Sequence, residues 1–118
     1  MLILGSCSID PYPHGKRIYN DQCASCHMTD GSGLGKEIPS LQRKISNPGL
    51  WACYIRNGIV KERVQQGVTY TARMPAHPQL NASEIANVIN FIQSRWVEES
   101  RFIRLDSVNI WLRECNEN

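Results

Sequence analysis

The segment Cys23-Ala24-Ser25-Cys26-His27 restricts the fold of this chain more than any other part of the sequence. Two thiols three positions apart, followed at once by an imidazole, form the pattern by which haem is attached covalently: the thiols add to the haem vinyl groups and the imidazole binds the iron. The spacing fits one helical turn, so the three side chains can meet one face of a flat porphyrin. The chain is therefore expected to fold around a cofactor.

Two other uses of a Cys-x-x-Cys pair are less compatible with this sequence. A thioredoxin-like redox pair accompanies a βαβ pattern, and a structural zinc site needs further ligands such as a second Cys-x-x-Cys; neither pattern is found. The 118 residues suffice for one domain, and 8% are aromatic, beside 8 Gly and 6 Pro. Such a composition suits loops around a bulky prosthetic group that supplies much of the core.

Charge and motif content exclude several classes of function. The formal net charge is +2, and the basic residues are scattered without a run of one sign, so nucleic-acid binding is not indicated. Two haem propionates would cancel most of that excess, so partners would be steered by local patches around the haem edge. The sequence lacks a constellation typical of a hydrolase or transferase. We therefore do not expect a self-contained enzyme.

Residues 1–13 are interpreted as a truncated export signal followed by a tether. Leu4-Gly5-Ser6-Cys7 resembles the lipobox of bacterial lipoproteins, in which the cysteine is lipidated after signal cleavage. The apolar stub before it is too short to span a membrane. We expect Cys7 to be a lipidation site, the alternative being a disordered N-terminus with a chance cysteine. The 5 cysteines also favour an oxidising compartment.

Hydrophobic periodicity and capping residues predict an all-α fold of four or five short helices with long loops. In the first helix, near 14–23, one face carries Ile18, Tyr19, Gln22 and Cys23. A glycine-rich loop over 29–39 follows, and a small hairpin is expected between Val60 and Tyr70. The other helices are expected from Asn47-Pro48 to Gly58, from Asn81 with its capping partner Glu84 to Trp96, and after Asp106 or Ser107 with Cys115 on the inner face.

A haem iron bound by His27 needs a second ligand on the opposite face of the porphyrin. Met74 is the natural candidate, because it precedes Pro75 in a loop far along the chain. Methionine ligation would raise the reduction potential. Methionine also serves as a flexible core filler. Other candidates are weaker ligands by position: Met28, Met1, His14 and His77.

These pieces resemble the class I monohaem cytochrome c family over residues 14–97. The resemblance is carried by Gly15-Lys16-Arg17-Ile18-Tyr19, by Met74-Pro75 and by the helix from Glu84 to Trp96. It implies a cytochrome c fold around one covalently bound haem c, with His27 and Met74 as the iron ligands. Gly15 and Tyr19 would then cross the last helix of the domain near Phe91.

The same resemblance implies two supporting roles in haem binding. Family members use a proline carbonyl to accept the Nδ1 hydrogen bond of the ligating histidine, and Pro39 stands where that residue is expected. Such a partner fixes the imidazole and raises its basicity. Tyr70, four residues before Met74, is similar to the family's aromatic residue that hydrogen-bonds a propionate. The alternative for Tyr70 is a half-buried strand tyrosine.

Residues 98–118 extend beyond the ordinary class I pattern and are expected to form a short helix packed on the domain. Cys53 and Cys115 are the cysteines left when haem takes the motif pair and lipid takes Cys7. A Cys53–Cys115 disulfide would use every thiol, and small cytochromes with a tail pinned back look similar. On the chain-entropy model it would stabilise the fold by about 4 kcal/mol. Two buried free thiols are the alternative.

The expected function is one-electron transfer, because a six-coordinate iron has no vacant position for other chemistry. The resemblance implies an exported, periplasmic or membrane-anchored monomer, which touches the membrane only through a lipid. It would carry electrons from a quinol-oxidising complex or a dehydrogenase to a terminal oxidase. Two alternatives stay open: a haem sensor in which a gas displaces Met74, and an accessory subunit docked on a periplasmic dehydrogenase through the tail helix.

Overall fold

The structure is a computed structural model that describes residues 10–43, 45–65 and 67–115. Cys7, the expected lipidation site, lies outside these residues. The described chain is mostly helical with long loops, as the sequence predicts, and it contains one small sheet. Its elements in order are α1 (Pro13–Gln22), α2 (Ala24–His27), α3 (Pro48–Asn57), β1 (Arg63–Gln65), β2 (Val68–Tyr70), α4 (Ala82–Trp96) and α5 (Leu105–Arg113).

Helices α1 and α4 cross at close range, and Gly15 makes this approach feasible. A Cβ atom added at Gly15 would collide with the backbone carbonyl of Asn87 and lie 2.9 Å from the Phe91 Cβ. Tyr19, which is fully buried, packs its ring 5.6 Å from that of Phe91 and 5.2 Å from that of Trp96. The predicted crossing of Gly15 and Tyr19 with the last helix of the domain near Phe91 is confirmed.

Side-chain caps stabilise the first turns of α3 and α4. The Asn47 side chain accepts a hydrogen bond from the Leu50 backbone N–H at 3.2 Å, and Pro48 occupies the first turn of α3. Asn81 and Glu84 form the predicted reciprocal capping box at the start of α4, with bonds of 2.8 and 3.0 Å. Each cap satisfies backbone donors that a helix cannot pair internally.

Strands β1 and β2 form the predicted hairpin. They are antiparallel and pair Arg63 with Tyr70, Val64 with Thr69, and Gln65 with Val68. Because side chains alternate along a strand, Arg63 and Tyr70 lie on the same face of this pair. On the predicted face of the first helix, Ile18, Tyr19 and Cys23 are buried, whereas Gln22, at the end of the helix, is exposed.

The last helix departs from the sequence prediction at both ends. It starts at Leu105, with Asp106 in its first turn, rather than after Asp106 or Ser107. Arg104, in extended backbone, precedes it and makes no side-chain cap, so the preference for Asp or Ser as a cap was misleading here. Cys115 lies one residue beyond the helix cap Glu114 and is half-buried, not on an inward helical face.

The extension is held to the domain at several points. Asn90, buried in α4, donates a hydrogen bond to the Ile103 carbonyl at 2.9 Å and accepts one from the Ile103 N–H at 2.7 Å. Gln93 donates to the Arg101 carbonyl at 3.1 Å. A disulfide joins Cys53 to Cys115, 62 residues apart, in the predicted pairing. The buried amides satisfy extended backbone that would otherwise lack partners.

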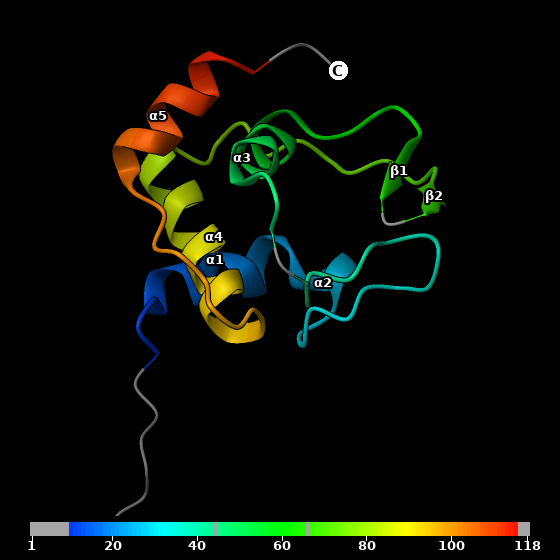
Figure 1. Ribbon diagram of the computed structural model, residues 1–118, viewed down its shortest axis with the longest axis horizontal. Helices are drawn as coiled ribbons and strands as arrows, with labels where there is room; N and C mark the ends of the chain where they lie inside the picture. The colour runs from blue at the N-terminus through cyan, green and yellow to red at the C-terminus, as the bar shows by residue number, and fades with distance from the viewer. Residues whose placement is uncertain (1–9, 44, 66, 116–118) are drawn as a thin grey trace, which may run out of the picture.

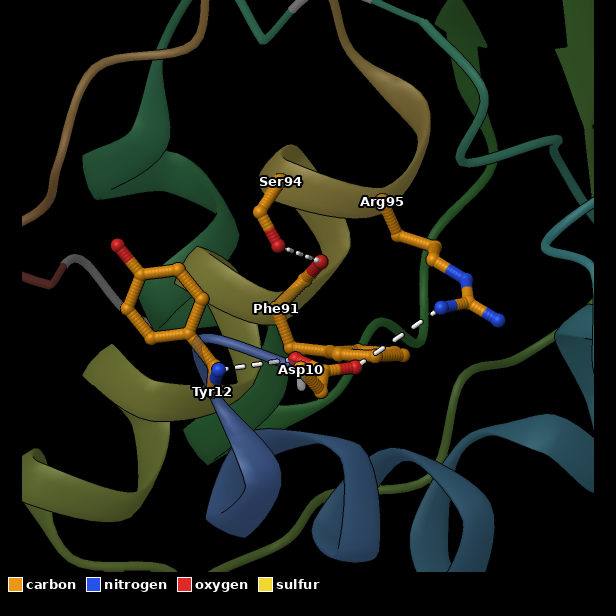
Figure 2. A network of polar contacts seen from close by, with 5 residues as sticks. All are labelled: Asp10, Tyr12, Phe91, Ser94 and Arg95. Atoms are coloured by element: carbon orange, nitrogen blue, oxygen red, sulfur yellow. Dashed lines mark hydrogen bonds and ion pairs between the residues drawn. The ribbon is translucent and has the colours of Figure 1, made fainter. Parts of the chain in front are cut away.

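The segment before α1 is tied to the end of α4. Asp10 accepts a hydrogen bond from the Tyr12 N–H at 2.8 Å and forms a 3.9 Å ion pair with Arg95, while Ser94 bonds the Phe91 carbonyl at 2.9 Å (Figure 2). Arg95 is about half exposed, so the ion pair contributes little stability. The ion pair nevertheless shows that the segment before α1 lies next to the end of α4.

The arrangement of the elements leaves the functional motif on one side of the molecule. In Figure 1, α1, α4 and α5 gather on the left, whereas α2, the loop after it and the β1–β2 hairpin lie on the right. Helix α3 stands between the two groups. Among the helices that the structure describes, none has the length and apolar character needed to span a membrane.

Candidate functional site

A cavity of about 460 Å³ lies between α2, the loop after it, α3 and the segment that carries Met74. Its volume falls within the roughly 300–1,000 Å³ typical of cofactor sites. Five of the residues expected to serve the haem form part of its wall: Cys23, Cys26, His27, Pro39 and Met74. The fold thus brings together residues that are up to 51 positions apart in the chain, from Cys23 to Met74.

His27 ends α2, and its ring is oriented by a backbone partner. Its Nδ1 atom lies 3.1 Å from the carbonyl oxygen of Pro39, which is the contact expected from the sequence. Because a carbonyl only accepts, Nδ1 carries the hydrogen, and the neutral ring keeps Nε2 as the unprotonated nitrogen. Burial lowers the pKa of His27, and the bond to Pro39 opposes that shift. A neutral, oriented imidazole is the form that binds iron.

Gly33 lets the loop hold Pro39 at that position. Its backbone N–H donates to the His27 carbonyl at 3.0 Å, and its φ is 73°. A Cβ atom added there would collide with the Ile38 carbonyl and lie 2.7 Å from the Pro39 oxygen that accepts from His27. Glycine is therefore needed for both the backbone conformation and the close approach.

The two motif cysteines do not resemble a catalytic redox pair. Cys23 is buried and Cys26 is exposed. Burial raises the pKa of Cys23 to about 12, and Cys26 adds to that shift. A redox-active thiol needs a lowered pKa, because the thiolate is the nucleophile. In the described part of the chain, moreover, no three His, Cys, Asp or Glu side chains are grouped as a metal site would need.

Met74 is held beside the cavity by a short antiparallel bridge. Its N–H and carbonyl exchange hydrogen bonds with the carbonyl and N–H of Ile59, both at 2.9 Å. Ile59 directly follows Gly58, the residue that ends α3 with φ 74° and ψ −175°. Of the competing ligands in the described residues, none is part of the cavity wall: Met28, His14 and His77. Met1 lies outside the described residues.

Arg63 adds a cationic group that the sequence analysis did not single out. It is part of the cavity wall; its Nη1 donates to the Ala72 carbonyl at 3.2 Å, while its buried Nε has no partner. Burial lowers the pKa of Arg63, but an arginine stays charged. An unpaired buried donor on a cation requires an acceptor. An anionic group in the cavity would supply it.

Tyr70 is placed next to Arg63 instead of in the cavity wall. It is buried on β2 with 4% of its surface exposed, and the Arg63 guanidinium carbon lies 5.5 Å from the centre of its ring. It is absent from the residues that line the cavity. The structure therefore shows Tyr70 as a buried strand residue that supports Arg63 through a cation–π contact, and its bond to a propionate stays a prediction.

The charges of the cavity wall match the expected cofactor. Of the described residues, three arginines contribute to the wall, Arg43, Arg63 and Arg73, against one carboxylate, Glu37. Much of the rest is apolar, including the side of α3 that carries Leu50, Trp51, Tyr54 and Ile55. A flat apolar macrocycle with two carboxylates fits this combination of apolar wall and cations. The residues present thus fit a haem.

Comparison with known proteins agrees with this geometry. The sequence model of the cytochrome c family matches residues 13–96. The gluconate 2-dehydrogenase cytochrome c subunit of Pantoea cypripedii is 33% identical over 89 residues, which cover 70% of this chain and 20% of that protein. The cytochrome c subunit of the alcohol dehydrogenase (quinone) of Gluconacetobacter polyoxogenes is 30% identical over 86 residues, covering 70% and 18%. The chain thus spans about a fifth of these relatives.

Proposed function

The chain belongs to the cytochrome c family, and on that premise we propose that it carries single electrons for a dehydrogenase through a His27- and Met74-ligated haem c. A covalently bound haem c and a role in electron transfer follow from the family itself. The haem supplies an iron that alternates between its ferrous and ferric states. The proposal concerns which residues hold it and which partner it serves.

The observation that carries the ligand assignment is the shared cavity wall of His27 and Met74. In the proposal, Cys23 and Cys26 form the thioether bonds, and His27 presents Nε2 to the iron while Pro39 holds Nδ1. Met74 supplies the second ligand from the segment bridged to Ile59. Imidazole and thioether together favour a raised reduction potential.

Arg63 is proposed to hold a haem propionate through its unpaired Nε. Arg63→Gln is expected to destabilise the haem-loaded protein by about 2 kcal/mol, because a buried propionate then loses a charge-assisted hydrogen bond. It should also lower the reduction potential, since removal of a nearby positive charge favours the ferric state. Thermal unfolding and redox titration measure the two effects. Arg73→Gln is the matched control, because Arg73 is on the same cavity wall but is exposed.

A fully ligated iron leaves electron transfer as the chemistry open to the site, so this chain is proposed not to be an enzyme by itself. The rival function is a haem sensor in which a gas replaces Met74. The observation that favours the sensor function is that Met74 lies in a loop between β2 and α4, rather than in a helix or strand. Loops in general move more easily than helices and strands, which would favour exchange of the ligand, whereas the two hydrogen bonds to Ile59 oppose it.

The dehydrogenase partner is proposed from the names of the relatives, which are cytochrome c subunits of gluconate and quinone alcohol dehydrogenases. Within that role two forms are possible. The chain is an accessory subunit of a dehydrogenase, or it is a shuttle that takes electrons from a dehydrogenase or a quinol-oxidising complex and delivers them to a terminal oxidase. Leu50 and Val64 contribute to the cavity wall yet are 42% and 67% exposed. They offer a small apolar face for a transient partner. An exported location, with Cys7 lipidated, belongs to the same proposal.

The test is a set of absorption spectra on protein matured in a haem-attaching periplasm, with carbon monoxide added to the reduced form. We expect covalent haem, six-coordinate spectra in both oxidation states, and slow carbon monoxide uptake. Cys26→Ser should retain at most one thioether bond, which serves as the control for attachment. Rapid carbon monoxide binding by the parent would support the sensor instead. Protein that matures without covalent haem would contradict both functions.

A further inference from the structure

The C-terminal extension is the part of the chain to which the proposed function gives no role. The cytochrome c family match ends at residue 96, whereas α5 begins at Leu105 and packs against both α3 and α4. Figure 1 shows α5 at the end of the molecule farthest from α2, beside α3 and α4. Its placement against α3 matters, because α3 forms part of the haem cavity.

Two attachments hold the extension from its two ends. At its start, the paired hydrogen bonds between Asn90 and Ile103 fix the backbone to α4 inside the protein. At its end, the disulfide fixes Cys115 to Cys53 on α3, with their Cα atoms 5.6 Å apart. Val108, midway along α5, has no exposed surface. The extension is therefore attached both to α4 and to α3.

Trp111 brings α5 close to the first turn of α3. A Cβ atom built on Gly49 would lie 3.1 to 3.3 Å from three atoms of the Trp111 indole. The indole therefore already lies against the backbone of α3. Gly49 and Cys53 are four residues apart in α3, so the indole and the disulfide contact the same helical face.

The neighbouring face of α3 is the wall of the haem cavity. Leu50, Trp51 and Tyr54 all line it. Leu50 also lines a second, smaller cavity of about 260 Å³, together with Trp111 and both cysteines of the disulfide. One side chain of α3 thus borders the haem cavity on one side and the extension on the other. A displacement of Trp111 would therefore be expected to shift the side chains of this wall.

Helix α3 also leads to the proposed iron ligand. Its C-terminal residue is followed by Gly58 and Ile59, and the backbone of Ile59 is bridged to Met74 by two hydrogen bonds of 2.9 Å. The Ile55 carbonyl accepts a further bond from the His77 N–H at 2.9 Å. A shift of α3 would therefore reach the ligand segment through its backbone.

We propose that Trp111 and the Cys53–Cys115 disulfide are positioning groups that hold the α3 wall of the haem cavity and thereby raise the reduction potential. The inference rests on the proposed function, because it assumes a haem in the cavity with Met74 as a ligand. A wall held in place excludes water from the apolar side of the haem. The lower polarity then disfavours the more charged ferric state.

The experiment compares the haem-loaded parent with Trp111→Ala and with the double variant Cys53→Ser and Cys115→Ser. Midpoint potential and imidazole affinity of the ferric protein are measured, since imidazole competes with Met74 for the iron. Both perturbations are expected to lower the potential. They should also tighten imidazole binding by about tenfold, within the usual range of coupling between two sites.

Two controls separate positioning from general stability. Ile110→Ala changes a residue on the same helix that is 45% exposed, and it should leave both readouts at parental values. Trp111→Phe keeps an aromatic ring against Gly49 and should restore most of the parental potential. If Trp111→Ala does not fold, the parent with its disulfide reduced and its thiols alkylated replaces it in the comparison.

The outcomes distinguish this inference from the proposed function. Folded variants that melt at lower temperature but keep the parental potential and imidazole affinity would overturn the inference, since the tail would then act on stability alone. A parent that already binds imidazole as readily as Met74→Ala does would overturn the Met74 assignment instead. In that case the difference in midpoint potential between parent and variants still decides whether the tail positions α3.

Discussion

Met74→Ala is expected to lower the reduction potential by on the order of 0.2 V, a fraction of the roughly 0.8 V over which axial ligands set haem potentials. The thioether stabilises the ferrous state, and water or another oxygen ligand in its place favours the ferric state. The mutant should also lose the absorption band that reports methionine bound to ferric haem, and its reduced form should bind carbon monoxide quickly. Redox titration and carbon monoxide mixing give both readouts.

Met28→Ala is the matched control for this experiment. Met28 is the same residue type and follows His27 directly, but it does not contribute to the cavity wall. Its side chain should therefore have no influence on the iron, and the spectra and potential should stay parental. If Met28→Ala lost the methionine band while Met74→Ala kept it, the ligand assignment would be reversed. An unchanged potential in Met74→Ala would likewise rule out Met74 as a ligand.

Gly58→Ala is expected to destabilise the protein by about 3 kcal/mol and to weaken the Met74 bond as well. Gly58 has φ 74° and ψ −175°, a conformation that side chains rarely adopt. A Cβ atom there would lie 2.6 Å from the Met74 carbonyl oxygen and 2.8 Å from the Ala76 nitrogen. The backbone that carries Met74 must therefore shift. Denaturant unfolding and imidazole affinity test the two effects.

Gly67→Ala separates the two causes of that effect. Gly67 also has a positive φ, 77°, yet an added Cβ would meet nothing within 4 Å. It should cost about 1 kcal/mol through backbone strain and leave imidazole affinity unchanged. If Gly58→Ala and Gly67→Ala behaved alike in both measurements, the contact with Met74 would not matter for ligation. Tighter imidazole binding in Gly58→Ala only would confirm the role of the contact.

Much of the site could be anticipated because its signals are local. The spacing within Cys23-Ala24-Ser25-Cys26-His27 specifies the attachment chemistry without knowledge of the fold. The Asn81 and Glu84 capping pair likewise identifies the start of α4 from neighbouring residues. Met74 was predicted as a ligand from its position before a proline and from the scarcity of other candidates. Each of these inferences depends on a few adjacent residues or on elimination.

Arg63 could not be recognised in the same way. From the sequence, a lone arginine in a short strand is expected to be a solvated side chain. That its Nε is buried and unpaired follows only from the tertiary structure. The neighbour of Tyr70 could not be predicted for the same reason: its distance from Met74 in sequence suggested a bond to a propionate, whereas the hairpin register pairs it with Arg63. Strand register depends on two segments at once, so neither segment reveals it separately.

The sequence by itself indicated the cofactor and the main helices, and it predicted the attachment residues and a Cys53–Cys115 disulfide, which the structure contains. Only the tertiary structure decided why Gly58 must be glycine, how Asn90 fastens the extension, and where Trp111 touches α3. The physical reason is the range of the interactions. Attachment chemistry and helix capping act over a few residues, whereas close packing and buried hydrogen bonds depend on the simultaneous placement of segments distant in the chain.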